Sequence, residues 1–369
     1  MSAEPPSDYR LDEVDATSEV ARNVGLARQT MAADLVTRGD GWERGVRSVL
    51  LANDKISIEV VVDRGLDIAS ARIRQIPVAW RSPTEIVAPW FVENSGYGPH
   101  RGFFGGLLTT CGLDHIGLPE EKPADRFAYP RRAKDAFPMH GRISGTPARL
   151  MGYGVREFAS GLEAYVEGIV TQVAVFGEHL ALTRRVSIRY GSSTVRVEDE
   201  VANQGYAASP LAMMYHVNAG WPVIAPGARV AIAGRLLRGE GDGSIIGAPK
   251  LAKPERTWLF AAAPDASGRG FAGVANARVD AKHAAGLKVA WETANLPTLA
   301  QWELAMGAGH YATGLEPSTL LVESPANGPR FPTLPPGESK KLGLTLELLL
   351  GDAGEELLSA SQTSRRKAR

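Results

Sequence analysis

Alternation of hydrophobic and polar residues is the strongest pattern in the chain, and it predicts β-strands. Residues 56–62 (Ile-Ser-Ile-Glu-Val-Val-Val) are β-branched and alternate at first, which is typical of a half-buried strand. The polar turn 63–67 separates them from the extended segment 68–73, so the two form a hairpin. A second hairpin is predicted from 180–190 and 194–201, joined by Gly191-Ser192-Ser193. Other strand candidates are 47–51, 164–175, 211–217, 289–291, 299–303 and 342–348.

Helical periodicity is scarce in this sequence. Only 18–36 and 354–360 show any of it. Numerous strands without crossover helices must pack sheet on sheet. We therefore expect one mainly antiparallel all-β sandwich over residues 26–352, with a flexible segment at 1–25 and a polar tail at 353–369.

Residues 82–135 interrupt the strand pattern with many glycines and prolines. A loop of this length inside a domain is usually functional or disordered. Aromatic residues between 90 and 104 argue against disorder. We expect a folded excursion close to a functional site.

Composition and charge exclude several classes of function. Lys+Arg and Asp+Glu both number 41, so no global positive field would attract nucleic acid or a membrane surface. No apolar stretch has the length of a membrane span, and the first residues do not resemble a secretory signal. The single cysteine, Cys111, lies in an apolar run and is expected to be buried rather than nucleophilic. We expect a cytoplasmic protein.

The candidate chemistry lies in isolated polar residues within apolar segments. No phosphate-binding loop, HExxH or CxxC metal motif, or GxSxG elbow is present. His216 and Asn218 end an apolar strand, where an unpaired polar group is costly to bury. His140 precedes Gly141, and Glu316 follows Gly314-Leu315. We expect His140, His216 and Glu316 to meet in one cleft, although each alone also fits a structural role in a turn or core.

Two arginines are further candidates. Arg64 lies in the charge-dense turn 63–67, where it either pairs with a neighbouring aspartate or offers a guanidinium fork to a substrate. Arg142 is two residues from His140, on the same face of an expected strand. The remaining histidines are His100, His115, His179, His283 and His310, and most are expected at the surface.

The order of these segments resembles the galactose mutarotase (aldose 1-epimerase) superfamily. The closer likeness is to its DUF4432 branch, through residues 63–68, 105–113 and 140–143, within a resemblance that spans roughly 45–350. The resemblance implies a β-supersandwich with few short helices. It also implies that Glu316 is the catalytic base and His216 the general acid.

By the same resemblance, His140 is a second histidine near the ring oxygen and hydroxyls, and Arg64 binds substrate. The family's middle acidic ligand to the sugar has no clear match. Gln301 and Trp302 lie in a plausible region for substrate binding, without an assigned role. Asn218 and Arg142 complete the expected substrate-binding set.

The expected function is anomer exchange of a monosaccharide by general acid–base ring opening, with no cofactor and no metal. Arg64 and Arg142 leave room for an anionic sugar. One alternative is a metal-dependent sugar isomerase or lyase, with His140, His216 and Glu316 as ligands. Another is a non-catalytic sugar-binding protein. The expected partner is a sugar, neither nucleic acid nor membrane, and the protein is a monomer or a homodimer.

Overall fold

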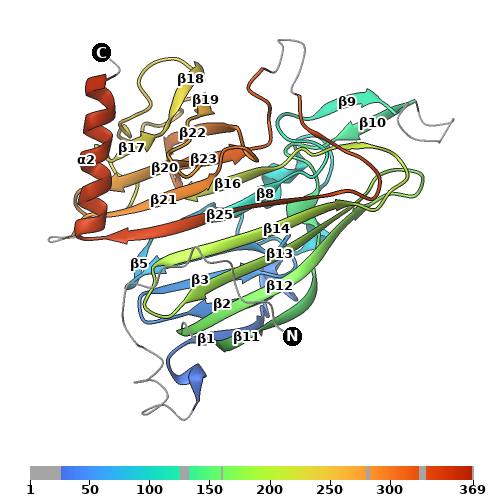
Figure 1. The fold of residues 1–369 in the computed structure, drawn as a ribbon, viewed down its shortest axis with the longest axis horizontal. Coiled ribbons are helices and arrows are strands. Elements are labelled where there is room, and N and C mark those ends of the chain that lie inside the picture. The colour runs from blue at the N-terminus through green and yellow to red at the C-terminus, as the bar shows by residue number, and fades with distance from the viewer. Residues whose placement is uncertain (1–25, 125–132, 159–160, 280–282, 324–329, 368–369) are drawn as a thin grey trace.

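Two antiparallel sheets make up most of the computed structural model, which describes residues 26–124, 133–158, 161–279, 283–323 and 330–367 (Figure 1). The larger sheet has the order β1-β2-β3-β4-β8-β16-β23-β22-β19-β18, with β5 paired to β4. Its strands are β1 (Ala32–Thr37), β2 (Arg47–Ala52), β3 (Ile56–Val61), β4 (Asp67–Ile73), β5 (Ile76–Pro77), β8 (Leu108–Cys111), β16 (Met214–Ala219), β18 (Gly234–Arg238), β19 (Arg256–Ala262), β22 (Thr298–Gly307) and β23 (His310–Ser318).

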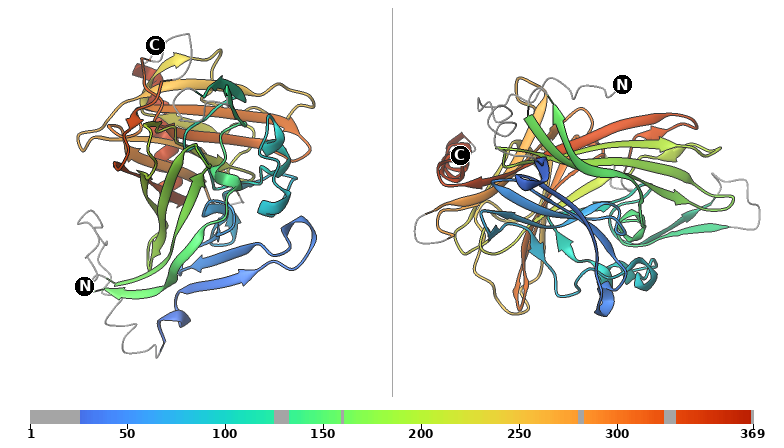
Figure 2. Two further views of the ribbon diagram at one scale, coloured as in Figure 1. Left: turned by 90° about the vertical axis from the view of Figure 1, so that its right-hand side faces the viewer. Right: turned by 90° about the horizontal axis from the view of Figure 1, so that it is seen from below.

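The second sheet has eight strands in the order β11-β12-β13-β14-β25-β21-β20-β17. They are β11 (Arg149–Phe158), β12 (Gly161–Val173), β13 (His179–Arg189), β14 (Thr194–Asn203), β17 (Arg229–Ile232), β20 (Arg269–Asn276), β21 (Ala285–Glu292) and β25 (Ser339–Leu350). In Figure 1 strands β12–β14 of this sheet lie in front of β2 and β3, and Figure 2 shows the molecule from two other sides.

Short elements connect the sheets. Three two-stranded ribbons pair β6 (Trp80–Arg81) with β7 (Gly105–Gly106), β9 (Glu120–Pro123) with β10 (Lys134–Phe137), and β15 (Ser209–Pro210) with β24 (Thr333–Leu334). The short helices are η1 (Ala27–Gln29), η2 (Gly41–Glu43), η3 (Pro89–Phe91), η4 (Gly98–Gly102) and η5 (Ile143–Gly145), and the α-helix is α2 (Asp352–Lys367).

The core lies between the two sheets, where alternating apolar side chains meet. Along β14, alternate side chains are buried, as the period-two pattern predicts. Val197 of this strand belongs to the same buried cluster as Val60 of β3 and Ile68 of β4. Each such side chain contributes roughly 1.5–3 kcal/mol when fully buried. The predicted all-β sandwich is therefore confirmed, as are the hairpins β3–β4 and β13–β14.

A buried polar network also joins the sheets, directly behind the strand that carries His216. Arg184 of β13 donates to both carboxylate oxygens of Asp199 on β14, and to Asp67 and Thr110 of the larger sheet. The hydroxyl group of Tyr215 donates to Asp199 at 2.8 Å. Because Tyr215 precedes His216, this bond holds β16 at a fixed distance from the second sheet.

Two expectations from the sequence need correction. The helix expected within 18–36 is wrong in its described part, because η1 is followed there by strand β1, whose Ala33 is buried in the core. The excursion 82–135 contains an interior strand, β8, paired with both β4 and β16. The helical periodicity at 354–360 is confirmed by α2, which occupies most of the expected polar tail and packs Leu357 on the second sheet near Ala275. Residues 1–25 lie outside the described residues.

Candidate active site

Strand β16 places His216 and Asn218 on the face of the sheet that is turned away from the core. Successive side chains along a strand point to opposite sides. Tyr215 and Val217 enter the core cluster, so His216 and Asn218 project from the other face. The strand is buried along its whole length between β8 and β23. Its histidine is therefore held on a rigid element.

Glu316 comes from β23, the neighbour of β16. Val217 pairs with Leu315 in the antiparallel register, so Glu316 lies across from His216. The Glu316 Oε1 atom is 3.2 Å from Nε2 of His216. A Cβ at Gly314 would lie 2.3 Å from that oxygen and 3.3 Å from Cε1 of the imidazole. Glycine at 314 therefore leaves the space that the pair occupies.

His140 reaches the same place from a loop. Its backbone has a φ of 59°, and the next residue, Gly141, has a φ of 78°. A Cβ at Gly141 would lie 2.2 Å from the carbonyl oxygen of Gly112, so only glycine permits this close approach. The rings of His140 and His216 are 5.7 Å apart, edge to face. Nδ1 of His140 accepts a bond from the Gly117 amide at 3.3 Å, so Nε2 bears the hydrogen in the neutral ring.

Aromatic side chains surround His216. Phe103 and Trp302 lie 5.2 and 5.5 Å from its ring, both edge-on. Trp80 packs on Trp302 at 5.9 Å and on Phe103 at 6.1 Å. These rings form an apolar wall beside the histidine and carboxylate, of the kind against which the C–H face of a sugar stacks.

Three buried polar atoms of the site have no hydrogen-bond partner within the protein. They are Nδ1 of His216, Oδ1 of Asn218 and Oε1 of Glu316, the last of which lies within ion-pair distance of Nε2 of His216 but forms no hydrogen bond with it. The three residues are exposed by 5, 0 and 4% respectively. An unmade bond of this kind costs about 1–3 kcal/mol, and three on adjacent strands indicate a site shaped for a polar ligand.

Burial sets the protonation of these groups. It raises the pKa of Glu316 to about 8, with a further contribution from the charge of Glu255. Burial lowers the pKa of His216 to about 4. Burial, and then the charge of His216, lowers the pKa of His140 to about 3. At neutral pH the Glu316–His216 pair therefore holds one proton, and His140 is a neutral donor.

The two candidate arginines lie apart from the group formed by His140, His216 and Glu316. Arg64 is buried and donates to the carbonyl oxygens of Ser144, Val87 and Gly102. It lines a small cavity that adjoins His140. Arg142 donates to the carbonyl of Ala136 and packs near Phe137, so its guanidinium is directed to β10.

Trp302 and Gln301 are on opposite faces of β22. Trp302 pairs with Gly314 and Gln301 pairs with Leu315, a core residue. Gln301 therefore projects away from Glu316 and donates to the carbonyl of Gly243 at 2.7 Å. Of the expected binding residues, Trp302 and Asn218 lie on the same face of the sheet as His216 and Glu316.

Sequence reasoning missed two neighbours of the site. Glu255 accepts a 2.8 Å bond from the Trp302 indole N–H and lies close enough to raise the pKa of Glu316. It sits in a loop rich in proline and charge, and nothing in the local sequence marks it. Phe103 was one aromatic among several in a glycine-rich stretch. His115, one of the histidines without an assigned role, is 1% exposed and contacts the Leu118 carbonyl instead of the site.

Two further properties bear on the alternatives. Among the described residues, no group of three or more His, Cys, Asp and Glu side chains is placed to hold a metal ion. In the same residues, no helix has the length and apolar character needed to cross a membrane. Cys111 is buried and unbonded to another cysteine, as expected.

Solved structures with the same fold come from several bacteria. A candidate aldose 1-epimerase from Klebsiella pneumoniae subsp. pneumoniae MGH 78578 is 22% identical, with a TM-score of 0.76 over 90% of this chain and 87% of the other. A galactose mutarotase-like protein from Clostridium acetobutylicum is 14% identical, with a TM-score of 0.60 over 87% and 99%. Galactose 1-epimerase from Lactobacillus acidophilus NCFM is 12% identical, with a TM-score of 0.58 over 87% and 100%.

At these identities the likeness establishes the fold alone, the β-sandwich of galactose mutarotase type. No curated protein matches the chain in sequence at a significant level. The family model described as "Domain of unknown function (DUF4432)" matches residues 43–348, which is most of the chain and includes every residue of the site described above. The chain belongs to the DUF4432 family.

Proposed function

We propose that the protein is a cofactor-independent aldose 1-epimerase that interconverts the anomers of a monosaccharide. The observation that supports this most directly is the row of unpartnered polar atoms on Glu316, His216 and Asn218 beside an aromatic wall. A sugar offers hydroxyl groups to such atoms and an apolar ring face to such a wall. The folds of the epimerases and mutarotase-like proteins above are consistent with this proposal.

The proposed reaction needs two proton transfers, one at each of the two oxygens bonded to C1. Glu316 as carboxylate removes the proton from the C1 hydroxyl, while His216 as imidazolium gives a proton to the ring oxygen. The bond between C1 and the ring oxygen breaks, and an aldehyde forms. Rotation about the C1–C2 bond and the reverse transfers close the ring on the other face. Each positioned acid or base typically contributes 10²–10⁴-fold.

In the free enzyme, the pKa values of the pair favour the protonation state that ring opening produces over the one from which it starts. Ring opening converts carboxylate and imidazolium into carboxylic acid and imidazole. With the pKa of Glu316 near 8 and that of His216 near 4, the one shared proton rests on Glu316 in the free enzyme. The arrangement at rest is thus the one that ring opening produces. The same arrangement starts ring closure, in which Glu316 protonates the carbonyl oxygen.

His140 and Glu255 have supporting roles in this proposal. Neutral His140 directs an N–H group toward the space beside His216, where it would donate to a sugar oxygen without competing for the proton. Glu255 holds the indole of Trp302 in place. Glu255 also keeps the pKa of Glu316 high, because its negative charge disfavours a second one nearby.

Exchange spectroscopy by NMR, applied to the anomers of a panel of neutral and acidic sugars, tests the proposal. Wild-type protein is expected to accelerate exchange of at least one sugar. Glu316→Gln is expected to lose 10²–10⁴-fold of that rate while sugar binding persists. Glu157→Gln, at an exposed position of β11, is the matched control. Absence of acceleration for every sugar, with binding retained, would instead support a non-catalytic sugar-binding protein.

The same assay separates the metal-dependent alternative. After prolonged dialysis against a chelator, the proposed reaction is expected to keep its full rate. Loss of activity that Zn²⁺ or Mn²⁺ restores would favour a metal-dependent isomerase or lyase on this scaffold.

A further inference from the structure

Two of the unpartnered atoms of the site belong to neighbouring side chains on one face of strand β16. In the described part of the chain, Nδ1 of His216 and Oδ1 of Asn218 have no hydrogen-bond partner. Their residues are 5 and 0% exposed, so solvent satisfies neither atom. Both side chains project from the face of the sheet that is turned away from the core, because they are two positions apart on a strand. A ring nitrogen that can donate and an oxygen that can accept are therefore buried close together.

The orientation of the Asn218 amide is set by two backbone carbonyl groups. Its Nδ2 donates to the carbonyl oxygen of His216 at 2.9 Å and to that of Gly105 at 3.4 Å. If the amide were turned over, its oxygen would face two other acceptors, so these bonds identify Oδ1 as the atom without a partner. Oδ1 can only accept a hydrogen bond, and it therefore needs a donor.

The two nitrogens of the His216 ring face different groups. Nε2 lies 3.2 Å from Oε1 of Glu316. With the shared proton at rest on Glu316, Nε2 is the nitrogen that can receive it, so Nε2 holds a lone pair. A neutral imidazole carries one hydrogen, which then lies on the other nitrogen. Nδ1 is therefore the donor in the resting ring.

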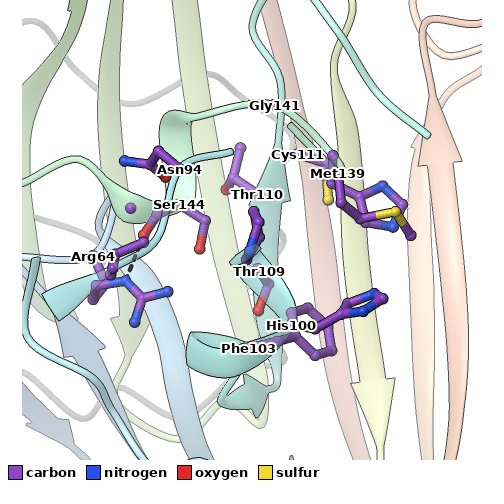
Figure 3. Close-up of a pocket in the computed structure, with 14 residues that line it drawn as sticks. Arg64, Asn94, His100, Phe103, Thr109, Thr110, Cys111, Met139, Gly141 and Ser144 are labelled. Carbon is purple, nitrogen blue, oxygen red and sulfur yellow. Dashed lines mark hydrogen bonds between the residues drawn. The ribbon is translucent and has the colours of Figure 1, made fainter. Parts of the chain in front are cut away.

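The other rings around His216 offer Nδ1 no acceptor among the described residues. Figure 3 draws the cavity beside this group, which Phe103, Thr109 and His140 line. Phe103 and Trp302 have no acceptor atom, and the lone pair of His140 already receives a backbone amide. The Thr109 hydroxyl gives its hydrogen to the same Gly105 carbonyl that Asn218 reaches. The amide oxygen of Asn218 is the acceptor that remains.

Asn218 also acts on the charge of His216 as an acceptor does. Burial has the largest effect on the pKa of His216 and lowers it to about 4, while the side chain of Asn218 acts in the opposite direction and raises it. An acceptor beside Nδ1–H stabilises the imidazolium, whereas an N–H donor in that place would destabilise it. The direction of this effect agrees with the orientation that the two carbonyl groups impose on the amide.

We propose that Asn218 is a positioning residue whose Oδ1 accepts the hydrogen on Nδ1 of His216 and so fixes which ring nitrogen takes part in the reaction. The inference rests on the proposed function and adds a residue to it. The bond closes when the ring turns onto the amide oxygen. It leaves Nε2 to receive the proton of Glu316 and to pass it to the ring oxygen of the sugar.

A neutral acceptor suits this position. The imidazolium that ring opening requires is held by a charge-assisted bond, and no second negative charge is added beside Glu316. An amide oxygen has two lone pairs, so Oδ1 of Asn218 can accept from Nδ1 and still bind a sugar hydroxyl.

The nitrogen that carries the hydrogen can be observed by NMR without any turnover. In protein labelled with 15N-histidine, long-range 1H–15N correlation spectra distinguish the two neutral forms of the ring, and the signals of His216 are assigned by their absence from His216→Gln. At neutral pH the hydrogen of wild-type His216 is expected on Nδ1. A hydrogen on Nε2 would overturn the inference, and this measurement does not depend on whether a variant folds.

Two substitutions at 218 separate the acceptor from the rest of the amide. Asn218→Leu is expected to increase the population with the hydrogen on Nε2. It is also expected to lower kcat for anomer exchange roughly tenfold to a hundredfold, with KM changed less than about threefold. Asn218→Asp keeps an acceptor and loses the donor, so Nδ1 is expected to stay protonated. A folded Asn218→Leu protein with an unchanged ring, whether or not its KM rises, would contradict the inference, because Asn218 would then be at most a substrate ligand.

Asn203→Leu is the matched control. Asn203 is 1% exposed, and its Nδ2 also donates to two backbone carbonyl groups, those of Ala207 and Leu334. It ends strand β14 of the second sheet, outside the site. Its loss is expected to lower stability and to leave both the His216 signals and kcat unchanged. An equal fall in kcat in Asn203→Leu and Asn218→Leu would reduce the effect of Asn218 to one of stability and overturn the inference.

The failure of this inference and that of the proposed function give different results. A hydrogen on Nδ1 that depends on Asn218, with no anomer exchange of any sugar, would leave the hydrogen bond and remove the epimerase. Rapid anomer exchange by a protein whose His216 carries its hydrogen on Nε2 would leave the epimerase and remove the role of Asn218.

Discussion

Replacing Glu316 by glutamine should change how the stability of the protein depends on pH, in a direction that the burial of this residue dictates. In the unfolded chain the carboxyl titrates near 4.5, and in the folded protein its pKa is about 8. Between these values the folded state holds a proton that the unfolded state has lost. The contribution of Glu316 to wild-type stability therefore falls as pH rises from 4.5 to 8, and this contribution is constant outside that window.

The size of the effect follows from the same two values. At about 1.36 kcal/mol per pKa unit, the burial of Glu316 costs the wild type roughly 5 kcal/mol at pH 8 and nothing below pH 4.5. Glu316→Gln carries no titrating group and escapes this cost. His140 and His216 titrate in both proteins beside an uncharged neighbour, so the difference between the proteins isolates Glu316.

Urea denaturation followed by tryptophan fluorescence, at intervals from pH 5 to pH 9, measures this difference. The free energy of unfolding of Glu316→Gln relative to wild type should rise by several kcal/mol up to pH 8 and then level. Glu157→Gln should run parallel to wild type. Parallel curves for Glu316→Gln between pH 5 and pH 8 would refute the reasoning, because the carboxyl would then titrate normally in the folded state.

Three other expectations follow from the site and the core. The kcat/KM for anomer exchange should be highest between about pH 4 and pH 8, where the Glu316–His216 pair holds one proton, and fall on both sides; a single step near pH 6.5 in a pH–rate profile would contradict this. Gly314→Ala should lower the same rate at least a hundredfold with little change in melting temperature, because its Cβ displaces the Glu316 carboxylate. Gly39→Ala, with open space around it, is the control. Equal rates for Gly314→Ala and wild type would disprove the displacement. Arg184→Met should lower the free energy of unfolding by about 3–5 kcal/mol, because it leaves two buried carboxylates unpaired; a loss below 1 kcal/mol in urea denaturation would show that they are not charged.

The strands predicted correctly from the sequence are those whose residue pattern arises within the strand itself. Residues 194–201 alternate because one face of the strand is buried and the other is not, and that periodicity is visible in the sequence. Residues 56–62 alternate only at first, because every residue from Ile58 onward is buried. Strand β8 was missed because all four of its residues are buried, so Leu108–Cys111 has no alternation to detect. The helix expected within 18–36 failed at β1 because pairing with β2 outweighs local propensity.

The residues of the candidate site also fall into those that the local sequence indicates and those that only the folded chain brings together. His216 and Glu316 drew notice because a polar residue in an apolar strand needs a reason to be there. The partners of Arg64 are 23 to 80 residues away in the chain, and no pattern near 64 encodes them. The side of the sheet that Gln301 occupies depends on which residue of β23 it pairs with, which is a property of the register. Glu255 is exposed in a loop, and only the folded chain brings it to Trp302.

The three carbonyl bonds of Arg64 have a consequence for how this fold can be re-engineered. Val87, Gly102 and Ser144 belong to separate segments of the chain, and the Arg64 side chain donates a hydrogen bond to the carbonyl group of each. The three segments cannot be exchanged one at a time, because a replacement that moves one carbonyl group also weakens the hydrogen bonds of Arg64 to the other two. A design that changes the proposed substrate should exchange the three segments as a set, together with Arg64, and leave strands β16 and β23 unchanged.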